Sequence, residues 1–284
     1  MKIAAIVSKP AKPELNEIVP EVLRWLGAHG YRVYIDQQTA AYRTHDFVIP
    51  RSELARYEPE FVIVLGGDGT LLSAARAIGA NDIPLLAVNL GSLGFLTEVP
   101  LDELYTTLEA VVNNQCPTEP RSLLNCRLVR DEQEIAQYFA LNDAVVKSTV
   151  ARLLGFAVTI NDDRVMEYQA DGVIIATPTG STAYSLAAGG PVFMPSVDAL
   201  LMTPICPHSL THRPLVVGSN SVISVRLDSG ADGFLSLDGQ VGMPVMQGDQ
   251  IVCRKALHHL RLLRMQKSFF DVLRSRLRWG QRSS

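Results

Sequence analysis

Residues 61–70 read Phe-Val-Ile-Val-Leu-Gly-Gly-Asp-Gly-Thr, and this stretch decides the fold. Five apolar residues predict a buried strand, and helically spaced apolar residues follow the glycine loop from about Leu71 to Ile78. A strand that turns through glycines into a helix places free backbone N–H groups at a positive helix end, where a phosphate binds. Glycine also lets a ligand approach the backbone closely. We therefore expect Gly66, Gly67 and Thr70 to form a phosphate or nucleotide loop.

Asp68 is the informative residue of this loop. A carboxylate is unfavourable where only phosphate is held, by several kcal/mol if the site is desolvated. It therefore suggests a second task, which is to accept a proton, to orient a hydroxyl or to recruit Mg²⁺. The alternative is a tight turn in which Asp68 caps the helix. The residues alone leave these possibilities open.

The first hundred residues alternate between strand and helix patterns. We expect strands at Ile3–Ser8, Tyr31–Asp36, Phe61–Leu65 and Ile83–Val88. A helix with one buried face is expected between Leu15 and Leu26, although Pro20 suggests a kink or a late start, and Gly30 is placed to end it. Short apolar runs separated by helices predict a parallel sheet covered on both faces, a Rossmann-like α/β domain over residues 1–99.

The pattern changes near Pro100. After one helical segment, Leu101–Asn113, turn-separated apolar runs predict a β-rich, sandwich-like domain over residues 100–256. The strand candidates are Leu123–Val129, Gln137–Val146, Leu153–Ile160, Val165–Tyr168, Val173–Ala176, Leu215–Val217, Val222–Leu227, Phe234–Leu237 and Ile251–Cys253.

The last segment, residues 257–284, is basic. From Arg254 to the end there are nine Lys or Arg residues and one acid. Phe269, Leu273 and Leu277 recur at helical spacing, which favours an amphipathic helix that packs back on the α/β domain. The alternative is a basic surface for a phosphate or a partner.

Composition excludes several classes of protein. The 284 residues suggest about two domains, and 47% hydrophobic with 19% charged residues rules out disorder. No apolar run approaches the roughly 18 residues of a membrane span. The four cysteines form no C-x-x-C pair, so we expect reduced thiols in a cytoplasmic protein that binds neither membrane nor nucleic acid. The motifs of P-loop NTPases, dinucleotide-binding dehydrogenases, α/β-hydrolases and zincins are absent.

Two further groups of residues are candidates for ligand binding. Asp171 precedes an apolar strand, and that strand runs into Thr177-Pro-Thr-Gly-Ser-Thr-Ala-Tyr-Ser185, which has many hydroxyls for one ligand and a ring at Tyr184 that can stack. Asn142 and Asp143 interrupt another apolar stretch. An amide beside a carboxylate suits a nucleoside, and the alternative is a strand end at which both face water. Asn89–Phe95 resembles a further turn, in which Phe95 is more typical of a core.

Together these motifs resemble the NAD kinase family. They are GGDGT at Gly66–Thr70, NLGSLGF at Asn89–Phe95, ND at Asn142–Asp143, ADG at Ala170–Gly172, TPTGSTAYS at Thr177–Ser185, PHSLTHRP at Pro207–Pro214 and DGQ at Asp238–Gln240. The resemblance implies transfer of the terminal phosphate of ATP to the 2′-hydroxyl of the adenosine ribose of NAD, giving NADP. It also implies a divalent cation, Mg²⁺, that accompanies ATP, no tightly bound prosthetic group, no protein residue as a metal ligand, a cleft between the domains and a homodimer or homotetramer.

The resemblance also implies a role for individual residues. Asp68 would accept the proton of the 2′-hydroxyl. NAD would be bound by Asp68, Gly69, Asn142, Asp143, Arg152, Gln169, Asp171, Thr182, Ala183, Tyr184, Ser185, Leu186, Ala187 and Gln240. The sequence departs from the family at Asp143, where many relatives carry the longer Glu, and at Gln169, where several bacterial relatives carry a basic residue. Two other functions stay open, a kinase of another hydroxyl such as that of a lipid or sugar phosphate, and a non-catalytic dinucleotide sensor.

Overall fold

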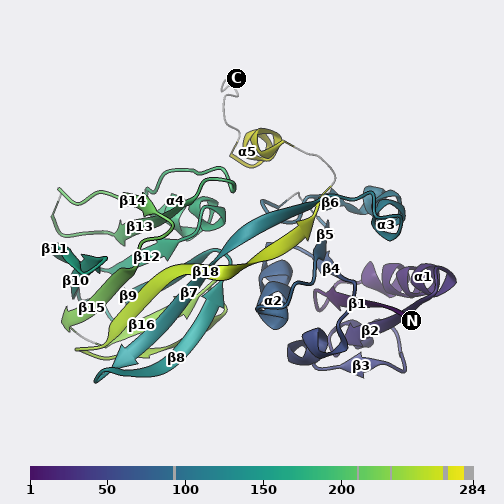
Figure 1. Ribbon diagram of the computed structural model, residues 1–284, viewed down its shortest axis with the longest axis horizontal. Coiled ribbons are helices and arrows are strands. Elements are labelled where there is room, and N and C mark those ends of the chain that lie inside the picture. Colours follow the sequence, from purple (N-terminus) through teal and green to yellow (C-terminus); the bar gives the residue numbers. More distant parts are fainter. Residues whose placement is uncertain (92–93, 210, 231, 265–267, 278–284) are drawn as a thin grey trace. The chain divides into compact units, whose positions relative to one another are not determined.

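The computed structural model describes residues 1–91, 94–209, 211–230, 232–264 and 268–277 (Figure 1). The chain forms two compact units. One contains Met1–Pro120 and Leu260–Ser284, and the other contains Arg121–His259. The division falls after Pro120, later than the predicted boundary at residues 99 and 100, because helix α3 (Leu104–Val112) buries Leu104 and Leu108 in the core of the first unit.

The first unit is built on a parallel sheet, as expected. Its strands are β1 (Lys2–Ser8), β2 (Tyr31–Asp36), β3 (Val48–Ile49), β4 (Phe61–Gly66), β5 (Leu85–Asn89) and β6 (Val99–Pro100). Their order is β5-β4-β1-β2-β3, and both β6 and the end of β18 (Gln250–Leu263) pair with β5. The order reverses between β1 and β4. In open α/β sheets the carboxyl end of such a switch point is where ligands bind.

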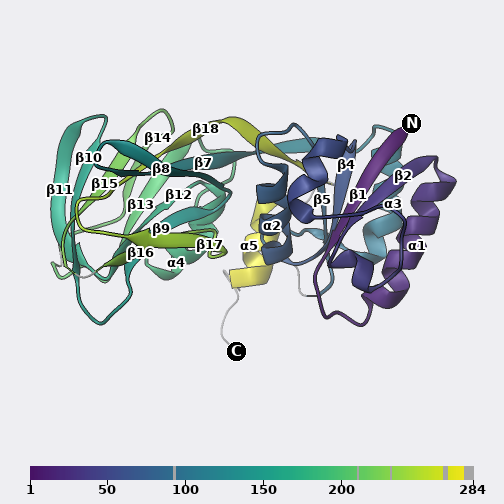
Figure 2. The ribbon, with the colours of Figure 1, turned by 90° about the horizontal axis from the view of Figure 1, so that it is seen from below.

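Helices cover both faces of this sheet (Figure 2). On one face, α1 (Leu15–Ala28) and α3 pack on alternate residues of β1, β2, β4 and β5. On the other, α2 (Asp68–Ile78) buries an apolar stripe. The described residues of the unit also include the 3₁₀ segments η1 (Thr39–Ala41), η2 (Arg51–Tyr57) and η3 (Leu101–Glu103). Because α1 already begins at Leu15, Pro20 does not delay its start, and Gly30 follows the helix with a φ of +80°.

The second unit is a β-sandwich, which confirms the predicted sandwich-like domain. One sheet has the antiparallel order β14-β13-β12-β9-β16-β17, and the other contains β11-β10-β15 with β18, β7 and β8. The first sheet comprises β9 (Asp143–Ser148), β12 (Gly172–Ala176), β13 (Ala199–Ile205), β14 (Leu215–Gly218), β16 (Gly233–Leu237) and β17 (Val241–Val245). The second comprises β7 (Thr118–Arg130), β8 (Gln133–Ala140), β10 (Leu154–Ile160), β11 (Asp163–Ala170) and β15 (Ile223–Ser229), together with β18.

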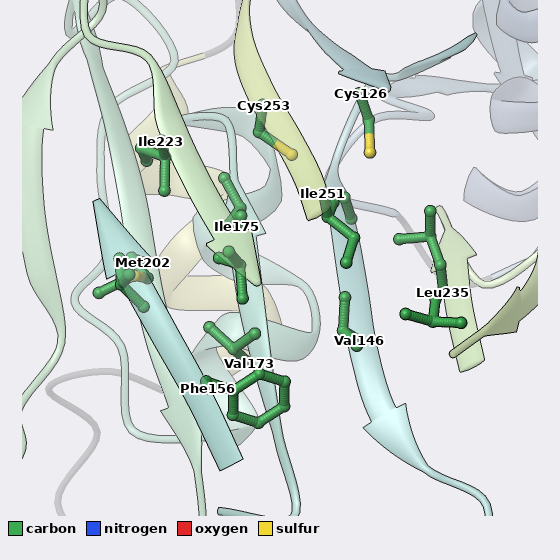
Figure 3. Packing of buried hydrophobic residues seen from close by; sticks show 14 of the residues in the cluster. Cys126, Val146, Phe156, Val173, Ile175, Met202, Ile223, Leu235, Ile251 and Cys253 are labelled. Atoms are coloured by element: carbon green, nitrogen blue, oxygen red, sulfur yellow. The ribbon is translucent and has the colours of Figure 1, made fainter. Parts of the chain in front are cut away.

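Side chains from both sheets fill the core of this unit. Every second residue of the strands points inward, for example Val173 and Ile175 of β12 and Phe156 of β10 (Figure 3). The outer face of β9, β12 and β13 carries a smaller cluster around Ile174 and Leu201. The segment η4 (Thr179–Thr182) and α4 (Tyr184–Ala187) follows β12 directly. The fold therefore presents the hydroxyl-rich loop at the end of a buried strand.

Several expected boundaries are wrong. The single strand expected at Gln137–Val146 is two strands, β8 and β9, because the backbone leaves the sheet at Leu141 and Asn142. Strands β13 and β17 have no counterpart among the expected ones, and β18 is far longer than Ile251–Cys253. Helix α2 begins at Asp68 instead of about Leu71.

The basic C-terminal segment contains the expected helix, α5 (Phe269–Leu277). It buries Val272 and Leu273, whereas Leu277 is 38% exposed, so the expected Phe269–Leu273–Leu277 stripe is only partly correct. The guanidinium of Arg276 lies 5.8 Å from the ring centroid of Phe95. The remaining basic residues of this segment after Leu277 lie outside the described residues.

Candidate functional site

The Gly66–Thr70 loop joins the end of β4 to the start of α2. A Cβ atom at Gly66 would lie 2.4 Å from the hydroxyl oxygen of Thr70, so a side chain cannot be accommodated there. Gly67 occupies the position before the helix, and its carbonyl accepts the N–H of Thr70 at 2.9 Å. Asp68 is therefore the first residue of α2, at the positive end of the helix.

The Asp68 carboxylate is held by another loop. Its Oδ1 accepts the N–H of Leu96 at 3.2 Å and both the N–H and the hydroxyl of Thr97 at 3.0 Å, while Oδ2 accepts the N–H of Phe95 at 3.0 Å. The carboxylate does not cap its own helix, so the capping interpretation is wrong. Among the hydrogen bonds of the described residues, Oδ2 has one donor and therefore keeps capacity for a further one.

The Asn89–Thr97 loop is shaped to meet this carboxylate. A Cβ atom at Gly94 would lie 2.1 Å from Oδ1 of Asp68, so only glycine permits the approach. The Nδ2 of Asn89 donates to the carbonyl of Thr97 at 3.2 Å and to its hydroxyl at 3.0 Å. The N–H of Gly91 in turn donates to Oδ1 of Asn89 at 2.7 Å. The GGDGT motif and the described residues of NLGSLGF thus form one assembly at the carboxyl ends of β4 and β5.

We expect Gly94→Ala to lower kcat by about 100-fold, because the added methyl group must displace Asp68 or Thr97 by an ångström or more. Gly91→Ala is the matched control. Its added Cβ would come no closer than 3.9 Å to Asn89 Oδ1, so its kcat should stay near that of the original enzyme. Steady-state kinetics on both variants, with circular dichroism to verify folding, measure the difference. Equal activity of the two folded variants would contradict this account.

In the second unit, another carboxylate organises the Asn142–Asp143 segment. Asp238 accepts the N–H of Leu141 at 3.0 Å through Oδ2, and through Oδ1 it accepts those of Asn142 at 2.7 Å and Asp143 at 3.2 Å. Its own N–H donates to the carbonyl of Asp143 at 3.0 Å, and its backbone is left-handed, with a φ of +51°. These hydrogen bonds replace the strand ladder where β8 ends and β9 begins.

The TPTGSTAYS loop packs directly against this segment. The hydroxyl of Thr177 donates to the carbonyl of Leu141 at 2.6 Å, and the N–H of Thr177 donates to the carbonyl of Asn142 at 2.9 Å. A Cβ atom at Gly180 would lie 2.0 Å from the Asn142 carbonyl oxygen. Gly180 is therefore required for the two loops to touch.

A cavity of about 320 Å³ opens between these loops. Its lining contains four of the predicted residues, Asn142, Asp143, Ala183 and Tyr184. Asp143 is only 4% exposed, so the alternative in which it faces water is wrong, whereas the Tyr184 side chain is 42% exposed and able to stack. The remaining lining residues were not expected from the sequence. They are Val145, Lys147, Ser236, Asp238 and Gly239.

The Asp143 carboxyl is the perturbed acid of this cavity. Burial and, second to it, the nearby negative charge of Asp238 raise its pKa to about 7, although a hydrogen bond from the Tyr184 backbone acts to lower it. The group therefore titrates near neutral pH. A hydroxyl that donates to its charged form would favour deprotonation.

The other expected site residues lie elsewhere. Ser185 is buried, and its hydroxyl is 2.8 Å from that of Thr203, so its side chain serves the fold. Thr182, Leu186 and Ala187 belong to η4 and α4 but do not line the cavity. The cavity lining also does not include the exposed residues Arg152, Gln169, Asp171 and Gln240. Within the DGQ motif the resemblance directed attention to Gln240, and the role of Asp238 was missed. The left-handed backbone of Asp238 is the feature that points to a special role.

The raised pKa of Asp143 predicts a pH dependence of stability. Between pH 4 and 7 the folded carboxyl keeps a proton that the unfolded one has lost, so the free energy of unfolding decreases as pH rises, by up to about 1.4 kcal/mol per pH unit. Asp143→Asn removes this contribution. Urea unfolding of both proteins from pH 4 to 8 should show the variant gaining relative stability with pH, and a difference that is constant with pH would contradict the assignment.

In the described part of the chain no three His, Cys, Asp or Glu side chains gather as a metal centre. The helices that the structure describes include none long and apolar enough to span a bilayer.

The first unit is a doubly wound α/β fold with a carboxylate at the start of a helix, and the second is a β-sandwich with a cavity of about 320 Å³. A helix start suits a phosphate and such a cavity suits a small organic ligand, which favours the class of nucleotide-dependent phosphotransferases. Comparison with known proteins identifies the family. The ATP-NAD kinase N-terminal domain matches residues 4–116, and the ATP-NAD kinase C-terminal domain matches residues 141–265. The chain belongs to the ATP-NAD kinase family, and its activity is the ATP-dependent phosphorylation of NAD.

Individual relatives agree with this assignment. The chain is 59% identical to the NAD kinase of Koribacter versatilis over 99% of its own length and 100% of the relative's. It is 49% identical to that of Acidobacterium capsulatum over 99% and 100%. Among solved structures, yeast NADH kinase complexed with NADH has a TM-score of 0.92 at 27% identity, covering 100% of this chain and 89% of that one. An Archaeoglobus fulgidus NAD kinase in complex with ATP shares the fold, with a TM-score of 0.79 at 24% identity over 96% and 98%.

Proposed function

We propose that the phosphate acceptor is the 2′-hydroxyl of the adenosine ribose of NAD, and that Asp68 accepts its proton as the terminal phosphate of ATP is transferred. The observation that carries this proposal is the fixed Asp68 carboxylate. Four hydrogen bonds orient it at the carboxyl end of β4, and Oδ2 retains acceptor capacity. A general base must be positioned before its proton affinity matters.

The loop donors make Asp68 a suitable late acceptor. Phosphoryl transfer depends mainly on positioning and charge compensation, and the acceptor proton is released as the bond to phosphorus forms. Three backbone N–H groups and the Thr97 hydroxyl fix the position of the carboxylate. The start of α2, with Gly66, Gly67 and Thr70, supplies the positive end of a helix toward phosphate oxygens. Asp68 would thus orient the hydroxyl throughout the reaction and take its proton at the end.

We propose that a Mg²⁺ ion arrives with ATP and is held mainly by the phosphates of the nucleotide and by water. The acceptor position left on Asp68 Oδ2 is assigned to the hydroxyl, so the chain itself would supply no ligand to the ion. When bound, the ion neutralises negative charge on the phosphates.

For the dinucleotide we propose the cavity of the second unit. Asn142 would hydrogen-bond a nucleoside, Asp143 would accept ribose hydroxyls, and the Tyr184 ring would stack on a base. Ala183 lines the same cavity. The contacts that we propose on family resemblance alone are those of Gly69, Arg152, Gln169, Asp171, Thr182, Ser185, Leu186, Ala187 and Gln240. We further propose that the enzyme is a homodimer or homotetramer, which sedimentation equilibrium tests.

A donor-by-acceptor matrix tests the reaction itself. The purified enzyme is incubated with ATP or polyphosphate as donor and with NAD, NADH, a sphingoid base or a sugar phosphate as acceptor. NADP formed from ATP and NAD, with the phosphate located on the 2′-oxygen by NMR, supports the proposal. Phosphate on any other position would contradict it.

We expect Asp68→Asn to lower kcat by about 10²–10⁴ with little change in KM for NAD, because the amide keeps an oxygen for Leu96 and Thr97 but accepts no proton. Thr97→Val is the control that removes one hydrogen bond to Asp68 and leaves the carboxylate, and its loss should stay within about tenfold. Equal losses in the two variants would show that Asp68 serves only to anchor the loop.

A separate prediction concerns Asp171, an exposed residue at the turn between β11 and β12. If it contacts NAD as proposed, Asp171→Ala weakens NAD binding by about tenfold and ATP binding much less. Asp163→Ala removes a similarly exposed carboxylate at the other end of β11 and serves as the control. Isothermal titration with each ligand gives the comparison, and equal weakening for NAD and ATP would refute this division of roles.

A further inference from the structure

A buried group of charges lies next to the loop that holds Asp68. Arg264 follows β18, and its guanidinium contacts the carboxylates of Glu98 and Glu119. The side chains of Arg264 and Glu98 are 13% and 6% exposed. The backbone N–H of Arg264 donates to the carbonyl of Pro117 at 3.1 Å, which fixes its place in the first unit.

Glu98 lies in the chain between a residue that holds Asp68 and the strand β6. It directly follows Thr97, which gives two hydrogen bonds to Asp68, and directly precedes β6, where Val99 pairs with Val88 of β5. A space of only about 10 Å³ remains beside Glu98 and Arg264. That volume holds at most one water molecule. A change in the pair therefore has little room to relax without moving the backbone of Glu98 and, with it, Thr97.

Stability alone is a poor explanation for this ion pair. Removing two charges from water offsets most of their attraction, so a buried pair stabilises a fold little more than apolar residues of the same volume. What it supplies is a fixed geometry. Arg264 enters from a strand end whose residues Leu262 and Leu263 pair with Leu85 and Leu86 of β5. The pair thus ties the Asp68-binding segment to the same strand from which Asn89 contacts Thr97.

We propose that Glu98 and Arg264 are positioning residues for the phosphoryl-transfer step, acting through Thr97 on the orientation of Asp68. The inference rests on the proposed role of Asp68. It assigns Glu98 and Arg264 no contact with NAD or ATP. Their loss therefore affects the chemical step while leaving dinucleotide binding by the second unit intact.

The test measures kcat and KM separately in Glu98→Gln and Arg264→Lys. We expect kcat to fall by about tenfold or more in Glu98→Gln, with KM for NAD within about twofold of the original enzyme. Arg264→Lys keeps the charge but cannot meet two carboxylates with one planar group. Its kcat should therefore lie between that of Glu98→Gln and that of the original enzyme. In the double variant Glu98→Gln/Thr97→Val, the losses should not multiply, because both changes act on one contact.

Arg130→Lys is the matched control. Arg130 forms a two-pronged ion pair, at 2.7 Å for both hydrogen bonds, with the buried Asp249 of the same unit, so the Arg-to-Lys substitution loosens a comparable pair that belongs to the second unit. It should lower the melting temperature and leave kcat unchanged. The proposal is overturned if folded Glu98→Gln keeps its kcat, if its KM for NAD rises as much as kcat falls, or if Arg130→Lys loses kcat equally. Asp68→Asn in the same assay separates the failures, because full activity there refutes the role of Asp68 itself.

Discussion

The structure of the first unit depends on the hydrogen bonds that the Phe95–Thr97 segment gives to the Asp68 carboxylate. An anion at the entry of a phosphate-binding loop would oppose the ligand unless its charge were satisfied by fixed donors. Backbone N–H groups do this without a competing positive side chain. The requirement explains Gly94, which allows the approach, and Asn89, which holds Thr97 from the end of β5.

The second unit uses a similar device for another purpose. Asp238 accepts backbone N–H groups where one strand ends and the next begins, as Asp68 does for the loop after β5. Burial is the main cause of the raised pKa of Asp143, and the negative charge of the neighbouring Asp238 adds to it. In the proposed reaction Asp68 acts on the substrate through Oδ2, whereas Asp238 lines the cavity that contains Asp143.

The sequence predicted what depends on local pattern and missed what depends on distant partners. The apolar run at Phe61–Leu65 and its glycine loop gave β4 correctly, because burial on both faces leaves a continuous signal. The expected strand at Gln137–Val146 was wrong, because the acceptor that interrupts it is Asp238, about a hundred residues away. Lys147 and Ser236 were missed for the same reason. Alternation assigns each to a face, but only the pairing of β9 with β16 brings them to one cavity.

The distribution of charge differs between the two units. The cavity of the second unit contains the carboxylates Asp143 and Asp238 and the ammonium of Lys147, an arrangement that suits hydroxyl donors better than phosphate. The start of α2 offers the opposite, a positive helix end with glycines that allow close approach. Asp68 stands at that helix end as a hydrogen-bond acceptor. The proposed reaction joins a phosphate to a sugar alcohol, and it therefore draws on both kinds of environment.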